Sequence, residues 1–207
     1  MMPYLKEEVK EKILASAVVK FKEQGFDGAS MRQIASGAGV SLGNVYRYFE
    51  NKEALFNAIV EPVYKSYIKF IHDIDDLILE EAAHSKESQS DTSNMAEINK
   101  IKDKLLEISE EHCTELLIIM DKSVGTKYEE AKQALIALLD KIVSKKFLPF
   151  MGITAATGLG GDITYIFSAA FIESICSILR KYESGDQVRL LIDRFIDLFF
   201  NGLETRI

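Results

Sequence analysis

The sequence is poor in cysteine, glycine and proline. It has two cysteines, Cys113 and Cys176, among 207 residues. Two are too few for a disulfide framework or a four-cysteine zinc site, which predicts a protein of a reducing compartment, the cytoplasm. The 12 glycines and three prolines exclude collagen-like and low-complexity chains. With 47% hydrophobic and 28% charged residues, the chain has the composition of a globular protein with a real core.

Long apolar segments are also lacking. The N-terminus has no apolar stretch like that of a signal peptide, and its acidic residues argue against a transit peptide. The longest segment of low charge, 163–179, contains Glu173 and several Ser and Thr. It is shorter than the roughly 20 apolar residues that span a membrane. We therefore expect no membrane partner and predict that 163–179 forms a buried helix.

Charge is distributed unevenly along the chain. The net charge is −7, which by itself disfavours a nucleic-acid partner. Residues 1–52, however, contain 8 Lys and Arg against 6 Asp and Glu, a balance of +2, so the remainder carries −9. The N-terminal segment is thus the part of the chain that can approach a polyanion, while the rest keeps the protein soluble.

Hydrophobic periodicity is helical almost throughout, which predicts an all-α fold. Pro62 lies within the fourth helix, and we expect a kink or a break there. The polar segment 84–94 is predicted to be a mobile loop. Later helices are predicted over 96–112, 113–123, 128–147, 162–182 and 186–202.

The N-terminal segment predicts three short helices followed by a long one. The first, over 7–24, ends at Gly25, a residue type that permits a left-handed cap. Ser30 and Gln33 have the spacing of a capping box at the start of the second. Ser41 is placed to cap the third helix, which ends near Phe49, and Asn51 to cap the fourth.

The second and third helices have the spacing of a helix-turn-helix. Ala35 is small enough for two helices to cross closely, Gly39 permits a turn with positive φ, and Val45 fills the angle between the helices. Two short helices cannot bury a core by themselves. The first helix, through Ile13, Ala17 and Phe21, is therefore expected to form the third wall.

The segment 13–60 resembles the TetR, or tetracycline-repressor-like, family of transcriptional regulators. The resemblance is carried by an ordered pattern that includes Phe21, Gly25-Phe26, Ile34-Ala35, Ala38-Gly39-Val40-Ser41 and Tyr48-Phe49. It covers under a quarter of the chain. It implies a helix-turn-helix DNA-binding domain over 1–52 and a larger helical domain for effector binding and dimerisation over 53–207. The expected function is a repressor that binds palindromic double-stranded DNA as a homodimer and is released by a small molecule.

The resemblance also indicates which residues touch DNA, and their chemistry is suited to it. The Ser41 hydroxyl and the free N–H groups beside it can hold a phosphate. Leu42, Gly43 and Asn44 form the first turn of the recognition helix, where the amide of Asn44 can pair with an adenine, Gly43 leaves room for close approach, and Leu42 contacts a thymine methyl or excludes water. The remaining predicted contacts are Arg32, Tyr46, Arg47, Tyr48 and, as a phosphate anchor, Lys52. Packing is the alternative for Tyr46, and a solvated helix face is the alternative for Arg47.

The last two predicted helices favour a second copy of the chain as partner. The segment 163–179 is apolar around its circumference. In 186–202, Val188, Leu191, Ile192, Phe195 and Phe199 form a stripe, with Ile196, Leu198 and Phe200 partly outside it. Helices that are hydrophobic on two sides need two partners, which predicts a homodimer through the last two helices of each subunit.

The family resemblance further suggests an effector cavity among the middle helices. Its candidate lining residues are Cys113, Leu117, Met120, Phe147, Met151, Tyr165, Ser168 and Phe171. A plain core is the alternative, because Met and aromatic clusters usually pack. We expect no catalytic residue, metal site or cofactor, since no acid/base or metal-ligand spacing is completed. An architectural DNA-binding protein without a sensor, and a helical enzyme, are the alternative functions.

Overall fold

The computed structural model describes residues 3–84, 91–146 and 160–204. Within these ranges it contains nine helices and no strand, which confirms the all-α expectation. The chain divides into two compact units. The first consists of residues 1–65 with 114–131, and the second of residues 66–113 with 132–207. The first unit thus contains, besides 1–52, the start of the fourth helix and the distant segment 114–131.

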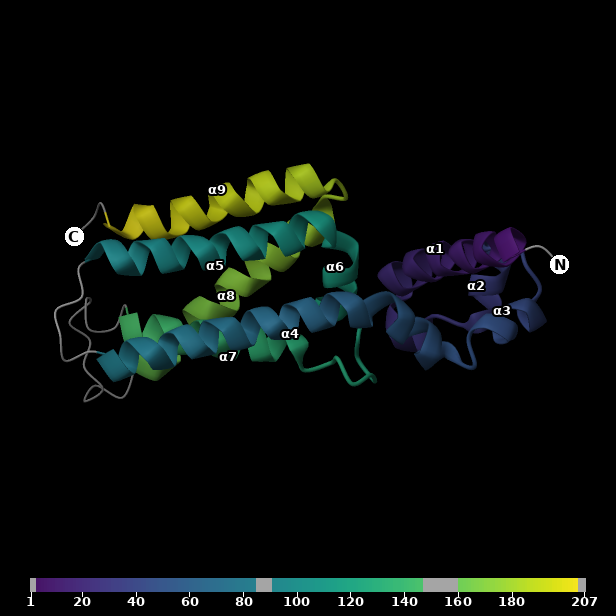
Figure 1. Ribbon diagram of the computed structural model, residues 1–207, viewed down its shortest axis with the longest axis horizontal. Coiled ribbons are helices and arrows are strands. Elements are labelled where there is room, and N and C mark those ends of the chain that lie inside the picture. The colour runs from purple at the N-terminus through teal and green to yellow at the C-terminus, as the bar shows by residue number, and fades with distance from the viewer. Residues whose placement is uncertain (1–2, 85–90, 147–159, 205–207) are drawn as a thin grey trace. The chain divides into compact units, whose positions relative to one another are not determined.

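The first unit is built on three N-terminal helices, α1 (Pro3–Gly28), α2 (Met31–Gly37) and α3 (Leu42–Tyr48). α2 packs against both α1 and α3, as Figure 1 shows. The start of α4 (Lys52–His84) and most of α6 (Cys113–Asp121) complete the unit. Its fully buried side chains include Ile13, Ala17 and Phe21 of α1, which confirms the expected third wall.

The predicted caps are confirmed at three helix starts. Ser30 Oγ accepts the Gln33 N–H at 3.3 Å, and Gln33 Oε1 accepts the Ser30 N–H at 2.9 Å, which completes the capping box. Ser41 Oγ accepts the Asn44 N–H at 3.2 Å. Asn51 Oδ1 accepts the Ala54 N–H at 2.7 Å. Each cap satisfies a backbone donor that the first helical turn leaves without a partner.

The end of α1 differs from the expected simple stop. Gly25 has φ 73° and ψ 176°, so it leaves the helical conformation, but a further turn continues to Gly28. This extended ψ turns the N–H of Phe26 away from α1, where the Lys122 carbonyl accepts it at 2.9 Å. The positive φ that the sequence required of Gly25 is therefore present, in a corner between two turns and not in a terminal cap.

The middle of the chain is more helical than predicted. α4 runs from Lys52 to His84 through Pro62, so of the two alternatives expected there, a kink or a break, the break is wrong. α5 (Asp91–Glu111) begins within the segment that we expected to be a loop, 84–94, of which residues 85–90 lie outside the described structure. Proline lacks one N–H donor, and the buried residues Val63, Tyr67 and Phe70 hold the next turns of α4 in the core.

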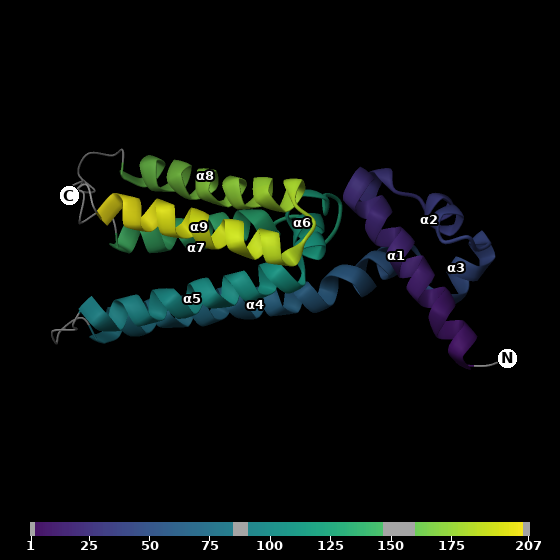
Figure 2. The same ribbon diagram turned by 90° about the horizontal axis from the view of Figure 1, so that it is seen from above.

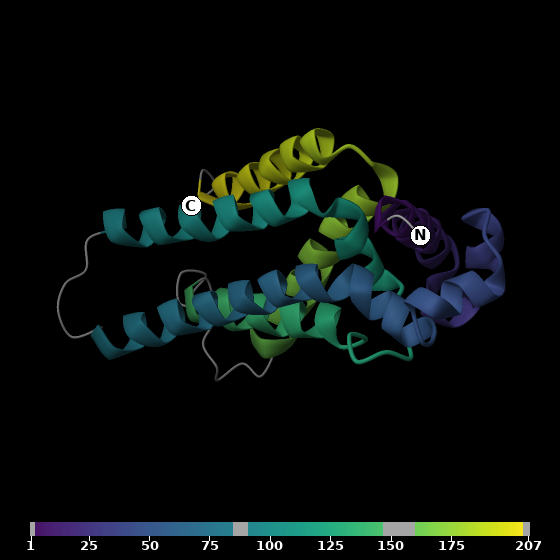
Figure 3. The ribbon, with the colours of Figure 1, turned by 45° about the vertical axis from the view of Figure 1, so that its right-hand side comes forward.

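The second unit contains α5, α7 (Ala131–Lys146), α8 (Gly160–Lys181) and α9 (Gly185–Glu204). α5 and α9 run side by side in Figures 1 and 3. They are antiparallel, because Glu110 at the end of α5 binds Arg189 near the start of α9 at 2.7 Å. Lys102 of α5 binds Asp193 at 2.7 Å and Asp197 at 2.5 Å, further along α9. Partial burial works against the charge of Lys102, but the two carboxylates raise its pKa above the usual value.

The helix α8, which lies along α9 in Figure 2, is only partly buried. Within the described residues, 161–181 is the one helix whose length and composition would allow it to cross a membrane. One of its faces packs in the unit through Phe171, Ile172 and Cys176, as in a core helix. The other exposes Ile163 and Ile166, so a single chain covers only one side of the helix that the sequence predicts to be buried.

α9 is amphipathic, with a buried stripe that differs slightly from the predicted one. Val188, Ile192 and Ile196 are buried at four-residue spacing, so Ile196 belongs to the stripe and not to its margin. Leu191 and Phe195 are half-buried. Leu190 and Leu198 are 57% and 76% exposed, which leaves apolar side chains of α9 as well as α8 uncovered in the single chain.

Candidate nucleic-acid interface

The turn between α2 and α3 has the geometry that the sequence predicts. Ala35 and Val45 are buried, and Gly39 has φ 66°. The Val40 N–H donates to the Ala35 carbonyl at 3.0 Å and closes the turn. Val45 is fully buried, so it joins the core and makes no contact outside the protein. These contacts fix the angle between the two helices.

A close approach that the sequence analysis missed locks α2 onto α1. A Cβ added at Gly37 would lie 2.4 Å from Ser16 Oγ. The same Ser16 hydroxyl donates to the Ile34 carbonyl at 2.9 Å. The only signal in the sequence is a glycine at the end of a short helix, a position where helix propensity disfavours it. Gly37 therefore lets the serine of α1 reach the backbone of α2.

The predicted recognition helix α3 presents its polar residues outward. Tyr46 is 49% exposed, and Gly43 and Arg47 are exposed as well. The predicted contacts that are half-buried are Leu42, Asn44 and Tyr48. Arg32 is exposed on the adjacent helix α2. The structure thus brings eight of the nine predicted contact residues, 32, 41–44 and 46–48, into the helix-turn-helix itself.

These outward side chains are available to an external partner. Among residues 3–84, 91–146 and 160–204, the side chains of Arg32, Tyr46 and Arg47 form no hydrogen bond or ion pair. Ser41 uses its oxygen to accept from Asn44, so its O–H remains as a donor. Two arginines, two tyrosine hydroxyls and an asparagine amide on one motif suit a polyanion with readable base edges.

Lys52, the expected phosphate anchor, contacts backbone oxygens of its own unit. Its Nζ lies 2.6 Å from the Phe26 carbonyl oxygen, 3.1 Å from that of Ala29 and 3.4 Å from that of Asp27. It also lies 4.4 Å from the centre of the Phe26 ring. An ammonium has three donors, and all three are directed at backbone oxygens of the same unit. The side chain is half-buried beside residues 26–29, where α1 ends and the chain turns into α2. We call these residues the α1–α2 corner.

The segment 114–131 packs onto this corner, which the sequence did not indicate. The backbone carbonyl of Lys122 accepts a hydrogen bond from the Phe26 N–H. Tyr128 is fully buried. The centre of its ring lies 4.8 Å from the ring centre of Tyr64 and 6.0 Å from that of Phe56. The ring of Phe56 in turn packs on that of Phe21 of α1, with ring centres 4.9 Å apart. A continuous aromatic cluster therefore joins the segment 114–131 to the helix-turn-helix.

The predicted effector residues are distributed over both units. Leu117 and Met120 belong to the first unit, and Cys113, Tyr165, Ser168 and Phe171 to the second. Phe147 and Met151 lie outside the described residues. The ring centres of Phe171 and Phe195 lie 5.1 Å apart. Tyr165 is 43% exposed, and its hydroxyl accepts a hydrogen bond from the Gln133 side-chain amide at 3.3 Å. Ser168 is fully buried, and its hydroxyl has no hydrogen-bond partner among the described residues.

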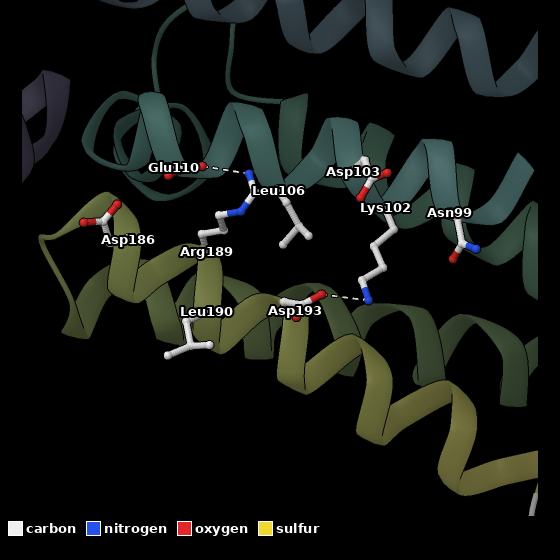
Figure 4. Close-up of a pocket in the computed structure, with 9 residues that line it drawn as sticks. All are labelled: Asn99, Lys102, Asp103, Leu106, Glu110, Asp186, Arg189, Leu190 and Asp193. Carbon is white, nitrogen blue, oxygen red and sulfur yellow. Dashed lines mark hydrogen bonds and ion pairs between the residues drawn. The ribbon is translucent and has the colours of Figure 1, made fainter. Parts of the chain in front are cut away.

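A cleft of about 500 Å³ opens between α5 and α9, shown in Figure 4, and none of the predicted effector residues that the structure describes lines it. Its lining residues are Asn99, Lys102, Asp103, Leu106, Glu110, Asp186, Arg189, Leu190 and Asp193. Both of its cations already pair with carboxylates across the cleft, Lys102 with Asp193 and Arg189 with Glu110. The charges in this cleft therefore hold α5 to α9.

Comparison with known proteins finds sequences similar to the helix-turn-helix segment. Residues 13–59 match the sequence profile of the bacterial regulatory proteins of the tetR family. The chain is 33% identical over 94 residues to the probable HTH-type transcriptional regulator YttP of Bacillus subtilis, covering 45% of this chain and 42% of that one. It is 43% identical over 54 residues to the HTH-type transcriptional regulator RutR of Escherichia coli K12, or 26% of each chain.

The likeness outside that segment is weaker. The chain spans less than half the length of these curated relatives. Among solved structures it is similar to NalD, the secondary repressor of the MexAB-OprM multidrug efflux pump in Pseudomonas aeruginosa, with 22% identity, a TM-score of 0.46, and coverage of 92% of this chain and 95% of that one. The profile match and the regulators that share this segment agree that residues 13–59 are similar to the helix-turn-helix segment of the tetR family of bacterial regulatory proteins.

Proposed function

We propose that this protein is a cytoplasmic transcriptional regulator that binds palindromic operator DNA as a homodimer, represses transcription there and is released by a small molecule. The observation that carries the proposal is the outward polar face of α3, held at a fixed angle by the buried residues Ala35 and Val45. The relatives named above are transcriptional regulators, which favours regulation over catalysis.

In this proposal the N-terminal half of α3 enters the major groove. Asn44 reads a base edge there, with adenine as the partner that suits a side-chain amide. Gly43 brings the backbone close to the DNA, and Leu42 lies at the edge of the contact. The hydroxyls of Ser41, Tyr46 and Tyr48 and the guanidinium groups of Arg32 and Arg47 hold the flanking phosphates.

The partner subunit covers the exposed apolar residues of α8 and α9. Ile163, Ile166, Leu190 and Leu198 are 42%, 65%, 57% and 76% exposed in the single chain. Side chains of this size on two neighbouring helices favour burial against a second copy. A two-fold dimer would place two α3 helices about one DNA turn apart, roughly 34 Å, and would require a near-palindromic site.

The effector is proposed to bind in the second unit, near Ser168. A buried hydroxyl without a partner costs about 1–3 kcal/mol, which a polar group of a ligand would recover. Phe171, one turn further along α8 and also buried, offers the apolar surface that such a ligand needs. An effector that favours the conformation with poorly spaced α3 helices lowers operator affinity, and by linkage the operator lowers effector affinity equally.

The proposal is tested by selecting bound sequences from a pool of random duplexes with the wild-type protein. We expect a near-palindromic motif. The variants Asn44→Ala and Tyr46→Ala should bind it more weakly, and Asn44→Ala should also relax the preference at one base pair of each half-site. A bidentate amide contact contributes about 1–3 kcal/mol of discrimination, about 5- to 150-fold, per half-site.

The same duplex distinguishes the alternative functions. Loss of the footprint on addition of a small molecule supports the sensor, and a footprint that persists with every metabolite tested favours an architectural protein. If neither substitution weakens binding or changes the motif, the assignment of α3 as the recognition helix is wrong.

Replacing Gly43 by Ala separates folding from DNA binding. Among the described residues, a Cβ at Gly43 meets nothing within 4 Å. Because alanine is the better helix former by about 1 kcal/mol, the variant should melt at a higher temperature. We expect its operator affinity to fall about tenfold, or 1.4 kcal/mol, since the methyl group would occupy the space needed for the groove.

The matched control is Gly161→Ala, in the first turn of α8, where an added Cβ also meets no atom of the described part of the chain within 4 Å. It should leave operator affinity at the wild-type value. A Gly43→Ala variant that is more stable and binds the operator as well as the wild type would show that the backbone at Gly43 does not approach the DNA. Melting curves and fluorescence anisotropy with the selected duplex provide both measurements.

A further inference from the structure

The position of Lys52 in its own helix is electrostatically unfavourable. It is the first residue of α4, where the helix dipole presents partial positive charge and favours an anion. Glu53, the next residue, follows that preference. A cation at this position needs compensation from elsewhere in the structure.

The compensation comes from the end of α1. The carbonyl oxygens of Phe26, Asp27 and Ala29 surround the ammonium at 2.6, 3.4 and 3.1 Å. They belong to the last turn of α1 and the residue after it, the negative end of that helix dipole. Cations near a helix C-terminus bind carbonyls that have no partner within the helix. Lys52 therefore neutralises the end of one helix from the start of another.

Phe26 is the centre of this arrangement. Its carbonyl accepts from Lys52, its N–H donates to the Lys122 carbonyl at 2.9 Å, and its ring lies 4.4 Å from the Lys52 ammonium. The Phe26 ring also packs edge to face with the ring of Phe56, with ring centres 5.1 Å apart. Both backbone groups and the side chain of one residue are thus held by α4 and by the segment 114–131.

This corner determines where α2 begins. Ala29 is buried and directly precedes Ser30, the cap of α2. α2 packs on α3 through the turn at Gly39, so a shift of the corner moves the recognition helix as well. We propose that Lys52 is a positioning residue that holds the α1–α2 corner and so sets the orientation of α2 and α3, and that it does not bind DNA phosphate. The inference rests on the proposed function for its effect on DNA.

The test compares Lys52→Met with Arg47→Ala, which removes a charge proposed to contact phosphate. Two quantities are measured on the full-length protein: the melting temperature without DNA, and the slope of log affinity against log salt concentration with the duplex selected by the wild type. Each phosphate contact contributes about −0.9 to that slope, so one residue in a dimer contributes about −1.8.

We expect Lys52→Met to lower the melting temperature by about 5 °C or more, since three charge-assisted hydrogen bonds are lost, and to leave the salt slope unchanged. Arg47→Ala should leave the melting temperature unchanged and reduce the magnitude of the slope by about 1.8. Lys52→Gln keeps amide donors without the charge and should melt between Lys52→Met and the wild type. If Lys52→Met is too unstable to bind DNA, the slope is measured on Lys52→Gln.

Two results would overturn the inference. One is a Lys52→Met variant with the wild-type melting temperature, and the other is a salt slope reduced in either Lys52 variant as in Arg47→Ala. Failure of the proposed function looks different, because the wild type then selects no duplex at all. In that case the melting temperatures of the Lys52 variants still decide whether the side chain holds the corner.

Discussion

A Gly185→Ala variant should lose much of the stability of its second unit. A Cβ built at Gly185 would lie 2.1 Å from the carbonyl oxygen of Glu110 and 3.0 Å from its carbonyl carbon. These atoms are backbone, so no side-chain rotation relieves the overlap, and α9 must move away from α5. Overpacking costs typically about 1–3 kcal/mol, and we expect this backbone clash to cost about 3 kcal/mol or more.

The expected loss is amplified by the ion pairs that depend on the same register. Arg189 binds Glu110 at 2.7 Å, and Lys102 binds Asp193 at 2.7 Å. A displacement of the start of α9 lengthens the contact between Arg189 and Glu110 and distorts the geometry of the contact between Lys102 and Asp193. Gly185 has no positive φ, so the effect comes from close approach and not from backbone strain.

Thermal denaturation followed by circular dichroism measures the loss. Gly161→Ala is the matched control, since it adds the same methyl group in the first turn of α8, where no atom of residues 3–84, 91–146 or 160–204 lies within 4 Å of it. That variant should melt at or slightly above the wild-type temperature. Equal melting temperatures for Gly185→Ala and Gly161→Ala would contradict the close approach of α9 to α5.

The elements that were predicted correctly depend on neighbours along the chain. The caps at Ser30, Ser41 and Asn51 each join residues three apart, and the positive φ of Gly39 is a property of one residue. Such interactions are visible in a sequence because the partners are fixed by spacing alone. They suffice to predict a helix-turn-helix and its outward face.

The features that were missed depend on partners far away in sequence. The carbonyl oxygens that Lys52 contacts lie 23 to 26 residues earlier in the chain, so the sequence, from which we expected a phosphate anchor at the start of the fourth helix, gave no sign of them. The contact of Lys122 with Phe26 joins residues that the family resemblance assigned to different domains. At Pro62, tertiary packing of α4 outweighed a local helix-breaking signal.

The largest loss in the first unit is expected for Tyr128→Ala. Tyr128 is fully buried and lies between Tyr64 and Phe56, with the Lys127 ammonium 5.1 Å from its ring centre. Removal of a buried aromatic ring destabilises a protein by about 3–5 kcal/mol, because transfer energy is lost and a cavity remains. Since this ring joins the segment 114–131 to the helix-turn-helix, the loss should appear around the α1–α2 corner.

Tyr128→Phe is the control, because it removes only the hydroxyl. That oxygen is buried and has no hydrogen-bond partner of ordinary geometry among the described residues. Burial also raises the pKa of the phenol, despite the opposing hydrogen-bonding and charge effects of Lys127, so the group stays neutral at pH 7. We therefore expect Tyr128→Phe to unfold within about 1 kcal/mol of the wild type, and Tyr128→Ala at much lower denaturant concentration.

Hydrogen exchange followed by mass spectrometry locates the effect of Tyr128→Ala. Peptides covering 53–65 and 114–131 should exchange faster in this variant, because the aromatic cluster that protects them has lost its central ring. Peptides from 160–181, in the second unit, should exchange as in the wild type. Faster exchange confined to 114–131, with 53–65 unchanged, would mean that Tyr128 stabilises only its own segment. The segment could not then hold the α1–α2 corner in place.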